Sequence, residues 1–112
     1  SAHAPEVESL PRSREEDAVL VYKRVTELNP TNDRAWHMLG NLLLDLGQLD
    51  EAISALEIAI SLNASRDIYY YHLGIAQAVQ KNYGDAVQSF EKALALNPKN
   101  IFSSCLQSIA QW

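Results

Sequence analysis

The sequence repeats itself at an interval of 34 residues, and this interval constrains the fold more than any other feature. When the chain is aligned with itself at that offset, the residues that match are mostly small or apolar. The matching pairs are Asp33 and Asp67, Trp36 and Tyr70, Leu39 and Leu73, Gly40 and Gly74, Ala52 and Ala86, Leu56 and Phe90, Glu57 and Glu91, Ala59 and Ala93, Leu62 and Leu96, and Asn63 and Asn97. The repeated positions are therefore expected to be residues that pack inside the protein rather than residues on its surface. A period of about 20–50 residues predicts stacked structural units.

The matching residues suggest how two helices of one unit would pack. Gly40 and Gly74 would leave room for a facing helix where the two helices cross most tightly. We expect Ala52 and Ala86 to do the same from the partner helix. The larger side chains are expected to fill the wider gaps, and these are Trp36, Tyr70, Leu56 and Phe90.

Start and stop signals divide the chain into helices. Ser13 and Glu16 have the spacing of a capping box, which predicts a helix start. Asn29-Pro30 and Asn97-Pro98 predict helix ends, since the residue before proline is biased out of the α region. The short connections at 47–48 and 81–82 require antiparallel neighbours. The predicted helices cover about 14–28, 33–46, 49–62, 66–80 and 83–96, with a sixth after Pro98.

Two segments resemble the tetratricopeptide signature, in which an aromatic residue and Leu-Gly on one helix precede small and large residues on the next. The first is Trp36-His-Met-Leu39-Gly40 with Ala52, Leu56 and Ala59, and the second is Tyr70-Tyr-His-Leu73-Gly74 with Ala86, Phe90, Ala93 and Pro98. The resemblance implies an all-α fold, a right-handed superhelical stack of antiparallel helix pairs. Ala18, Tyr22 and Val25 fall where the second helix of a preceding repeat would place its small, large and small residues.

This resemblance gives the expected domain organisation. Residues 1–13 would form an extended or disordered arm, since they contain two prolines and no apolar period. A half repeat (14–32) would be followed by full repeats at 33–66 and 67–100 and by a terminal capping helix at 100–112. A further repeat or a partner subunit could also cover that last helix. The chain is either a piece of a longer repeat protein or a stack that begins with half a repeat.

The resemblance also implies a concave groove, lined by the first helix of each repeat, where peptides bind. The predicted lining residues are Arg34, His37, Met38, Asn41, Asp45, Ile68, Tyr71, His72, Ile75, Val79 and Phe102, with Cys105 beside the last. One branch of the family clamps acidic C-terminal tails with lysines, an arginine and asparagines. Asn41 matches an asparagine of that clamp, but His37 replaces a lysine, and Ile68 and His72 bring no fixed positive charge. We therefore expect a protein or peptide partner that is apolar or aromatic rather than an acidic tail.

Composition excludes several other classes of function. The net charge of −5 and the scattered basic residues argue against nucleic-acid binding. No apolar run reaches the ~20 residues that span a bilayer. Cys105 has no partner for an internal disulfide, which mildly favours a reducing, cytoplasmic location unless a targeting signal has been removed.

No residues suggest an enzyme, a metal site or a cofactor. His37 and His72 could approach each other across adjacent helices, and Asp45 lies about two turns from His37, but lone histidines on such surfaces usually make polar contacts. A pH-dependent grip on the ligand is a further possibility for this pair. Two functions remain open: an adaptor that binds a peptide or helix in the groove, or self-association through the terminal helices.

Overall fold

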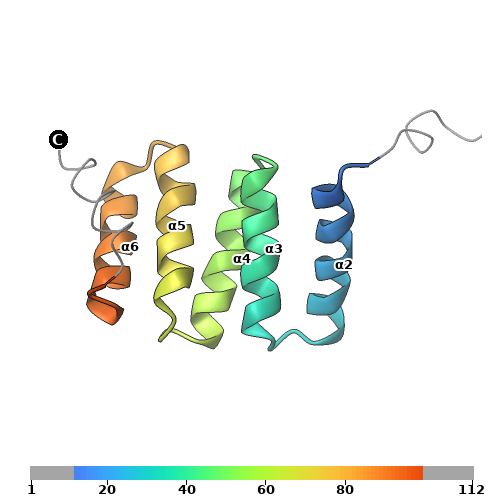
Figure 1. The fold of residues 1–112 in the computed structure, drawn as a ribbon, viewed down its shortest axis with the longest axis horizontal. Coiled ribbons are helices and arrows are strands. Elements are labelled where there is room, and N and C mark those ends of the chain that lie inside the picture. Colours follow the sequence, from blue (N-terminus) through green and yellow to red (C-terminus); the bar gives the residue numbers. More distant parts are fainter. Residues whose placement is uncertain (1–11, 100–112) are drawn as a thin grey trace, which may run out of the picture.

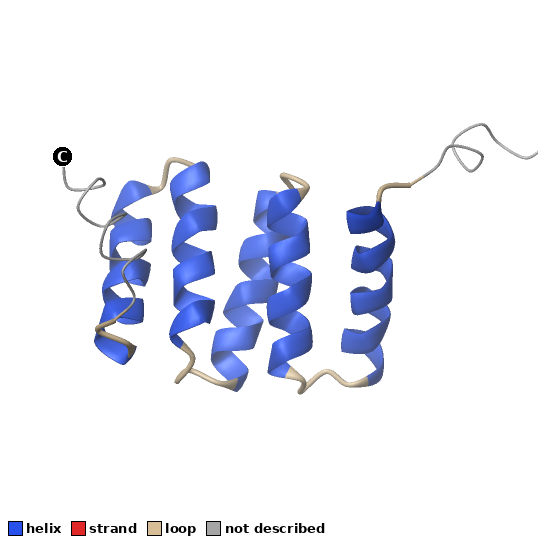
Figure 2. Cartoon of the chain, viewed as in Figure 1, coloured by secondary structure: helices blue, strands red, loops and turns tan. Residues whose placement is uncertain are grey.

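The computed structural model describes residues 12–99, and this part of the chain contains five α-helices and no strand (Figures 1 and 2). The helices are α2 (Arg14–Leu28), α3 (Asp33–Asp45), α4 (Leu49–Leu62), α5 (Asp67–Val79) and α6 (Tyr83–Leu96). The predicted bounds of these five helices are confirmed to within one residue. The predicted capping helix, with Phe102 and Cys105, lies outside the described residues, as does most of the predicted arm.

Each helix packs against the next one along the chain, and α3 also contacts α5 directly. The tightest pairs are α3 with α4 and α5 with α6, which are the two helix pairs of the repeats. Figure 1 shows the helices running side by side and roughly antiparallel. This arrangement confirms the all-α solenoid. Within residues 12–99, no helix has the length and apolar character needed to cross a membrane.

The local signals predicted from the sequence are present at the helix ends. The Ser13 hydroxyl accepts from the Glu16 backbone N–H at 3.1 Å, and the Glu16 carboxylate accepts from the Ser13 backbone N–H at 2.9 Å. This is the complete capping box. Asn29 and Asn97, each directly before a proline, are the C-caps of α2 and α6, and their backbone N–H groups donate to the Val25 and Ala93 carbonyls.

The two turns inside the repeats have the same hydrogen bonds. Gly47 N–H donates to the Leu44 carbonyl and Gln48 N–H to the Leu43 carbonyl, which is the Schellman pattern. Lys81 occupies the equivalent position in the second repeat. Gly47 has φ of 79° and Lys81 has φ of 69°, so both backbones are left-handed, and only glycine adopts this conformation without a steric cost.

Close packing between paired helices occurs at the two glycines. A Cβ on Gly40 would lie 2.7 Å from Leu56 Cγ, and one on Gly74 would lie 2.5 Å from Phe90 Cε1. The predicted tight crossing is confirmed, but the prediction for Leu56 and Phe90 was wrong. These two side chains lie against the glycines because the absent Cβ provides the space that they occupy.

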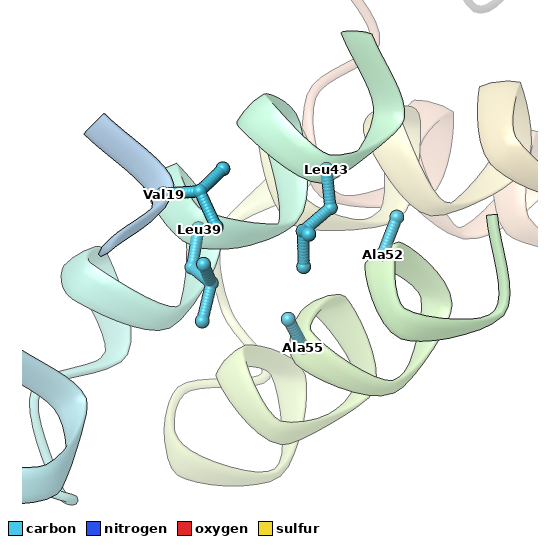
Figure 3. Packing of buried hydrophobic residues seen from close by; sticks show 5 residues of the cluster. All are labelled: Val19, Leu39, Leu43, Ala52 and Ala55. Atoms are coloured by element: carbon cyan, nitrogen blue, oxygen red, sulfur yellow. The ribbon is translucent and has the colours of Figure 1, made fainter. Parts of the chain in front are cut away.

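The core follows the small and large residues of the repeat. Val19, Leu39, Leu43, Ala52 and Ala55 form one buried cluster between α2, α3 and α4 (Figure 3). A second cluster joins Leu56 to Leu73 and Ala76. Trp36 and Tyr70 are only half-buried, so they line the edge of the core instead of filling its gaps as predicted.

The helix of the half repeat, α2, is the least buried. Ala18, Tyr22 and Val25 are half-buried, whereas their equivalents in the first full repeat, Ala52, Leu56 and Ala59, have no exposed surface. Leu20, Val21 and Leu28 are exposed at 49%, 60% and 69%. The described residues contain no first helix that packs on Ala18 and Tyr22 as α3 packs on their equivalents Ala52 and Leu56.

Candidate functional site

The predicted groove residues that the structure describes lie on α3 and α5, the two first helices. We call them together the groove face: Arg34, His37, Met38, Asn41, Asp45, Ile68, Tyr71, His72, Ile75 and Val79. Counted from the first member on each helix, the members follow at intervals of three or four residues or sums of these. Such intervals place the members on one side of their helix. Because α3 contacts α5 directly, the two sets form one surface.

The groove face combines exposed and half-buried side chains. Met38 is 39% exposed and Val79 is 55% exposed, both of which are high for apolar residues. Arg34 and Asp45 are exposed, and the other six side chains are half-buried. Phe102, predicted as the last member of this set, lies outside the described residues.

His37 and His72 join the two helices. His37 Nε2 lies 2.9 Å from His72 Nδ1, a hydrogen bond between neutral rings in which one nitrogen donates and the other accepts. The ring centroids are 5.0 Å apart. The expected approach of these two histidines is confirmed. Asn41 Nδ2 lies 3.4 Å from His37 Nε2, and Asn41 Oδ1 is buried without a hydrogen-bond partner among residues 12–99.

The environment of the two histidines favours their neutral forms. Burial lowers the pKa of His37 to about 4, with further lowering from His72 and Arg66. Burial also lowers the pKa of His72, while the Ile68 backbone and Asp45 oppose this shift. His37 therefore keeps its neutral form across most of the range of about pH 5–8 in which an ordinary histidine titrates. The sequence-based idea of a pH-dependent grip at mildly acidic pH finds no support at His37.

Beneath this pair lies Tyr69, which the sequence-based prediction omitted. The Tyr69 side chain is fully buried, its ring lies 4.7 Å from that of His37, and its hydroxyl donates to Asp33 Oδ2 at 2.5 Å. This hydrogen bond lowers the pKa of Asp33, while burial and the Asp33 carboxylate raise the pKa of Tyr69 to about 12. The guanidinium of Arg66 lies 5.5 Å from the centre of the ring. Tyr69 thus fixes the first repeat to the second below the groove face.

Asp33 also closes its own repeat. Asn63 Nδ2 donates to Asp33 Oδ2 at 3.3 Å, so the end of α4 is bonded to the start of α3. The same bond recurs one repeat later, where Asn97 Nδ2 donates to Asp67 Oδ2 at 3.3 Å. Four of the residues that match at the 34-residue offset are therefore two copies of one polar contact. The repetition of these aspartates and asparagines is visible in the sequence, but only the structure shows that they bond to each other.

Among the described residues, the groove face brings few metal-binding or titratable side chains together. Across residues 12–99, no group of three or more His, Cys, Asp or Glu side chains is placed to hold a metal ion. The two histidines bond to each other, and Asp33, four residues before His37 on α3, is already bonded to Tyr69 and Asn63. What the groove face offers a ligand is apolar surface with a few polar groups.

Helix pairs stacked at a fixed interval, with their first helices forming one face, define a helical repeat protein. The family model for the tetratricopeptide repeat matches residues 37–101, which is more than half of the sequence. The chain belongs to the tetratricopeptide-repeat family.

Two relatives share this repeat region. The human protein named tetratricopeptide repeat protein 13 is 30% identical over 80 residues, which are 71% of this chain and 9% of the relative. The DnaJ homolog subfamily C member 7 homolog of Dictyostelium discoideum is 30% identical over 74 residues, which are 66% of this chain and 14% of the relative. The chain thus spans only a small part of the length of either protein.

Solved structures with the same fold include peptide complexes. The first repeat domain of Spaghetti (RPAP3) bound to the HSP90 peptide SRMEEVD superposes with a TM-score of 0.85 at 20% identity, over 88% of this chain and 78% of that one. The protein MamA gives 0.84 at 27% identity, over 86% and 52%. The Yersinia enterocolitica secretion chaperone SycD, in complex with a peptide of the translocator YopD, gives 0.84 at 17% identity, over 88% and 80%.

Proposed function

We propose that this chain is a protein-interaction module that binds a peptide or a helix of a partner on the groove face. The observation that carries the proposal is the apolar surface exposed there, with Met38 39% and Val79 55% exposed. Ile68, Tyr71 and Ile75 lie half-buried on the same side of α5. Exposed apolar side chains grouped on one face are typical of interaction sites.

Two further observations support this proposal. RPAP3 and SycD, which share the fold, are both seen with bound peptides. The contacts of His37 with His72 and of Tyr69 with Asp33 hold α3 and α5 together, so that a ligand would meet a face already arranged for it. The unpartnered Oδ1 of Asn41 would accept an N–H from the ligand after a small rotation of the side chain.

We propose further that the partner segment is apolar or aromatic. Arg34 is the one residue of the groove face with a fixed positive charge, and His37 is held neutral by burial. Asp45 adds a negative charge. A carboxylate-rich tail would therefore lose water here without gaining the cations that compensate for the loss.

Two probe peptides test the proposal by isothermal titration calorimetry. We expect a soluble amphipathic peptide with leucines at i, i+3, i+4 and i+7 to bind at least about tenfold more tightly than the acidic peptide SRMEEVD. The Ile75→Asp change should weaken the first complex by about tenfold or more, because it places a charge in the apolar part of the face.

The matched control is Glu57→Gln, an exposed position on α4, which should leave the affinity unchanged. Tighter binding of SRMEEVD would reverse the proposed partner chemistry. An amphipathic peptide that binds Ile75→Asp as well as the wild type would remove the groove face from the proposal.

Self-association is the second candidate, and the exposed apolar side chains of α2 favour it. Leu20, Val21 and Leu28 are each about half exposed or more, so a second copy could cover them. Analytical ultracentrifugation at rising concentration distinguishes the two functions. A dimer that is lost in Val21→Asp supports association through α2, whereas a monomer at every concentration rules it out.

A further inference from the structure

A cavity of about 440 Å³ lies between the second helices α2 and α4, with α3 as its floor. We call it the α2–α4 cavity. Its floor consists of Trp36, Leu39 and Leu43, and Ala55 and Ile58 form the α4 wall. The indole N–H of Trp36 donates to the Pro30 carbonyl at 2.9 Å, which fixes the ring at the edge of the cavity.

This cavity lies on the side of α3 that faces away from the groove face. Successive residues of an α-helix are rotated by about 100°, since 3.6 residues make one turn. Viewed along the helix axis, the directions of Met38 and Asp45 on the groove face lie within about 40° of that of Arg34. The directions of Leu39 and Leu43 on the floor lie about 140–180° away from it. A ligand in the cavity would therefore not compete with one on the groove face.

The second repeat shows that the cavity does not follow from the fold alone. The corresponding space of the second repeat, lined by α5 and α6, measures about 190 Å³, less than half the volume. Three apolar lining residues of the first space are replaced there by polar or charged residues at the 34-residue offset. The replacements are Gln77 for Leu43, Ser89 for Ala55 and Lys92 for Ile58.

Those polar residues occupy the second space themselves. The Ser89 hydroxyl donates to Gln77 Oε1 at 2.6 Å, and the Lys92 ammonium lies 5.6 Å from the centre of the Tyr70 ring. In the first repeat no such pair can form between Leu43 and Ala55, so the space stays open and apolar. On the α2 wall, the hydroxyl of the buried Thr26 donates to the Lys23 carbonyl at 2.8 Å, so its hydrogen is already used within α2.

The rim of the cavity is mainly acidic. Glu27, Asp50 and Glu51 line it together with a single cation, Lys23. Lys23 is 3.5 Å from Glu51, and Arg24 of α2 is 3.0 Å from Glu27, so two of the three carboxylates have a cation partner. Asp50 accepts a neutral hydrogen bond from Gln80, and its charge remains uncompensated by this contact. An apolar floor thus lies inside a rim on which Asp50 leaves one net negative charge.

We propose that the α2–α4 cavity is a second docking site, which takes an apolar side chain of a partner protein with a Lys or Arg next to it. The volume falls within the range of about 300–1,000 Å³ that is common for specific ligand sites. The apolar side chain would lose its contact with water on the floor, and the carboxylate of Asp50 would attract the neighbouring cation. Together with the groove face, this site would let the module hold two segments at once.

The test is a titration of the ¹⁵N-labelled full chain with three synthetic peptides, followed by NMR chemical shifts. The first peptide contains Leu-Phe-Lys-Arg, the second Leu-Phe-Glu-Asp and the third Ser-Ser-Lys-Arg in the same flanks. We expect the first to shift the indole N–H of Trp36 and the amides of Ala55 and Ile58, with a Kd of about 1 mM or lower. The other two should bind at least about fivefold more weakly.

Two variants take the smaller, more polar space of the second repeat as their model. Ile58→Lys places the second repeat's cation at the half-buried position of the wall, and the triple variant Leu43→Gln, Ala55→Ser, Ile58→Lys copies all three polar replacements. The same residues already pack together in the second repeat, so both variants should keep their helical circular dichroism. Each should weaken the first peptide by about tenfold, whereas Glu57→Gln, at an exposed position of α4 outside the cavity lining, should not affect it.

Several results would overturn the proposal. It fails if no peptide shifts the Trp36 signal at millimolar concentration, or if the charge-reversed peptide binds equally well. It also fails if Ile58→Lys leaves the affinity unchanged or if the shifts are confined to the groove face. A dimer that disappears in Ile58→Lys would assign the cavity to a second copy of the chain instead. None of these outcomes depends on the amphipathic peptide that tests the groove face.

Discussion

Gly74 lies against the ring of Phe90, and a Cβ at this position would come within 2.5 Å of the ring. We predict that Gly74→Ala lowers the free energy of unfolding by about 1–3 kcal/mol, because the buried ring has to move. Alanine is the better helix former by about 1 kcal/mol, so helix propensity alone predicts the opposite sign. Urea denaturation of the variant and the wild type decides between the two effects.

Gly84 in the first turn of α6 provides the control. A Cβ there would meet no atom within 4 Å. Gly84→Ala should therefore leave stability unchanged or raise it by up to about 1 kcal/mol. If Gly74→Ala were as stable as Gly84→Ala, the tight crossing would not contribute to stability.

Lys81 has a left-handed backbone at the turn where the first repeat has Gly47. A residue with a side chain destabilises the folded chain by about 1–2 kcal/mol in this conformation. Glycine avoids this cost, but its greater conformational freedom stabilises the unfolded chain and offsets part of the gain. Lys81→Gly should therefore raise the free energy of unfolding by about 1 kcal/mol. Thermal denaturation would show this as a higher Tm, and an unchanged or lower Tm would mean that Lys81 carries no steric cost.

At the scale of the helix pair, the contact between α3 and α5 should depend on pH. Burial holds the pKa of His37 at about 4 in the folded chain, compared with 6.5 ordinarily. Between these values the unfolded state binds more protons than the folded state, so the free energy of unfolding should fall as the pH decreases. His72, whose pKa is also lowered, acts in the same direction.

Denaturation curves at intervals from pH 7 down to about pH 4 would measure this effect. His37→Gln is the matched variant, because it retains a polar side chain that does not titrate. Its stability should fall less steeply with acidification than that of the wild type. Parallel curves for the two proteins would show that His37 does not contribute to the pH dependence.

The helices themselves could be predicted closely from the sequence. Their ends depend on neighbouring residues, such as Ser13 with Glu16 or Asn97 with Pro98, and these local signals are visible without a structure. The buried Tyr69 could not be predicted in this way. Its role depends on Asp33, which is 36 residues away, and this interval differs from the repeat length by two.

The α2–α4 cavity was missed for a different reason. Aligning the sequence with itself identifies positions where the two repeats have the same or similar residues, such as Leu39 and Leu73. It does not identify positions where the repeats differ. The cavity depends on differences, above all Ile58 in place of Lys92 and Ala55 in place of Ser89. The residues that repeat determine the fold, whereas those that do not repeat distinguish one surface from the next.

For the whole molecule, stability should be uneven along the stack. Among the described helices, α2 packs mainly on α3, whereas α4 lies between α3 and α5. Val21 and Leu28 of α2 are exposed, whereas Ala52 and Ala59 of α4 have no exposed surface. We predict that backbone amides of α2 exchange with deuterium faster than those of α4, because the end of a stack opens at lower cost. Equal protection of both helices would indicate a single cooperative unit.

The polar contact that closes each repeat has a consequence for the length of the molecule. Asp33 bonds Asn63 and Asp67 bonds Asn97, and each pair joins the beginning of one unit to its own end. A copy of residues 33–66 inserted after residue 66 would bring both partners of this hydrogen bond with it. It would therefore not depend on a neighbouring repeat for this contact. The chain can thus grow or shrink in whole steps of 34 residues, as a modular rod does, while a cut inside 33–63 or 67–97 would separate an aspartate from its asparagine.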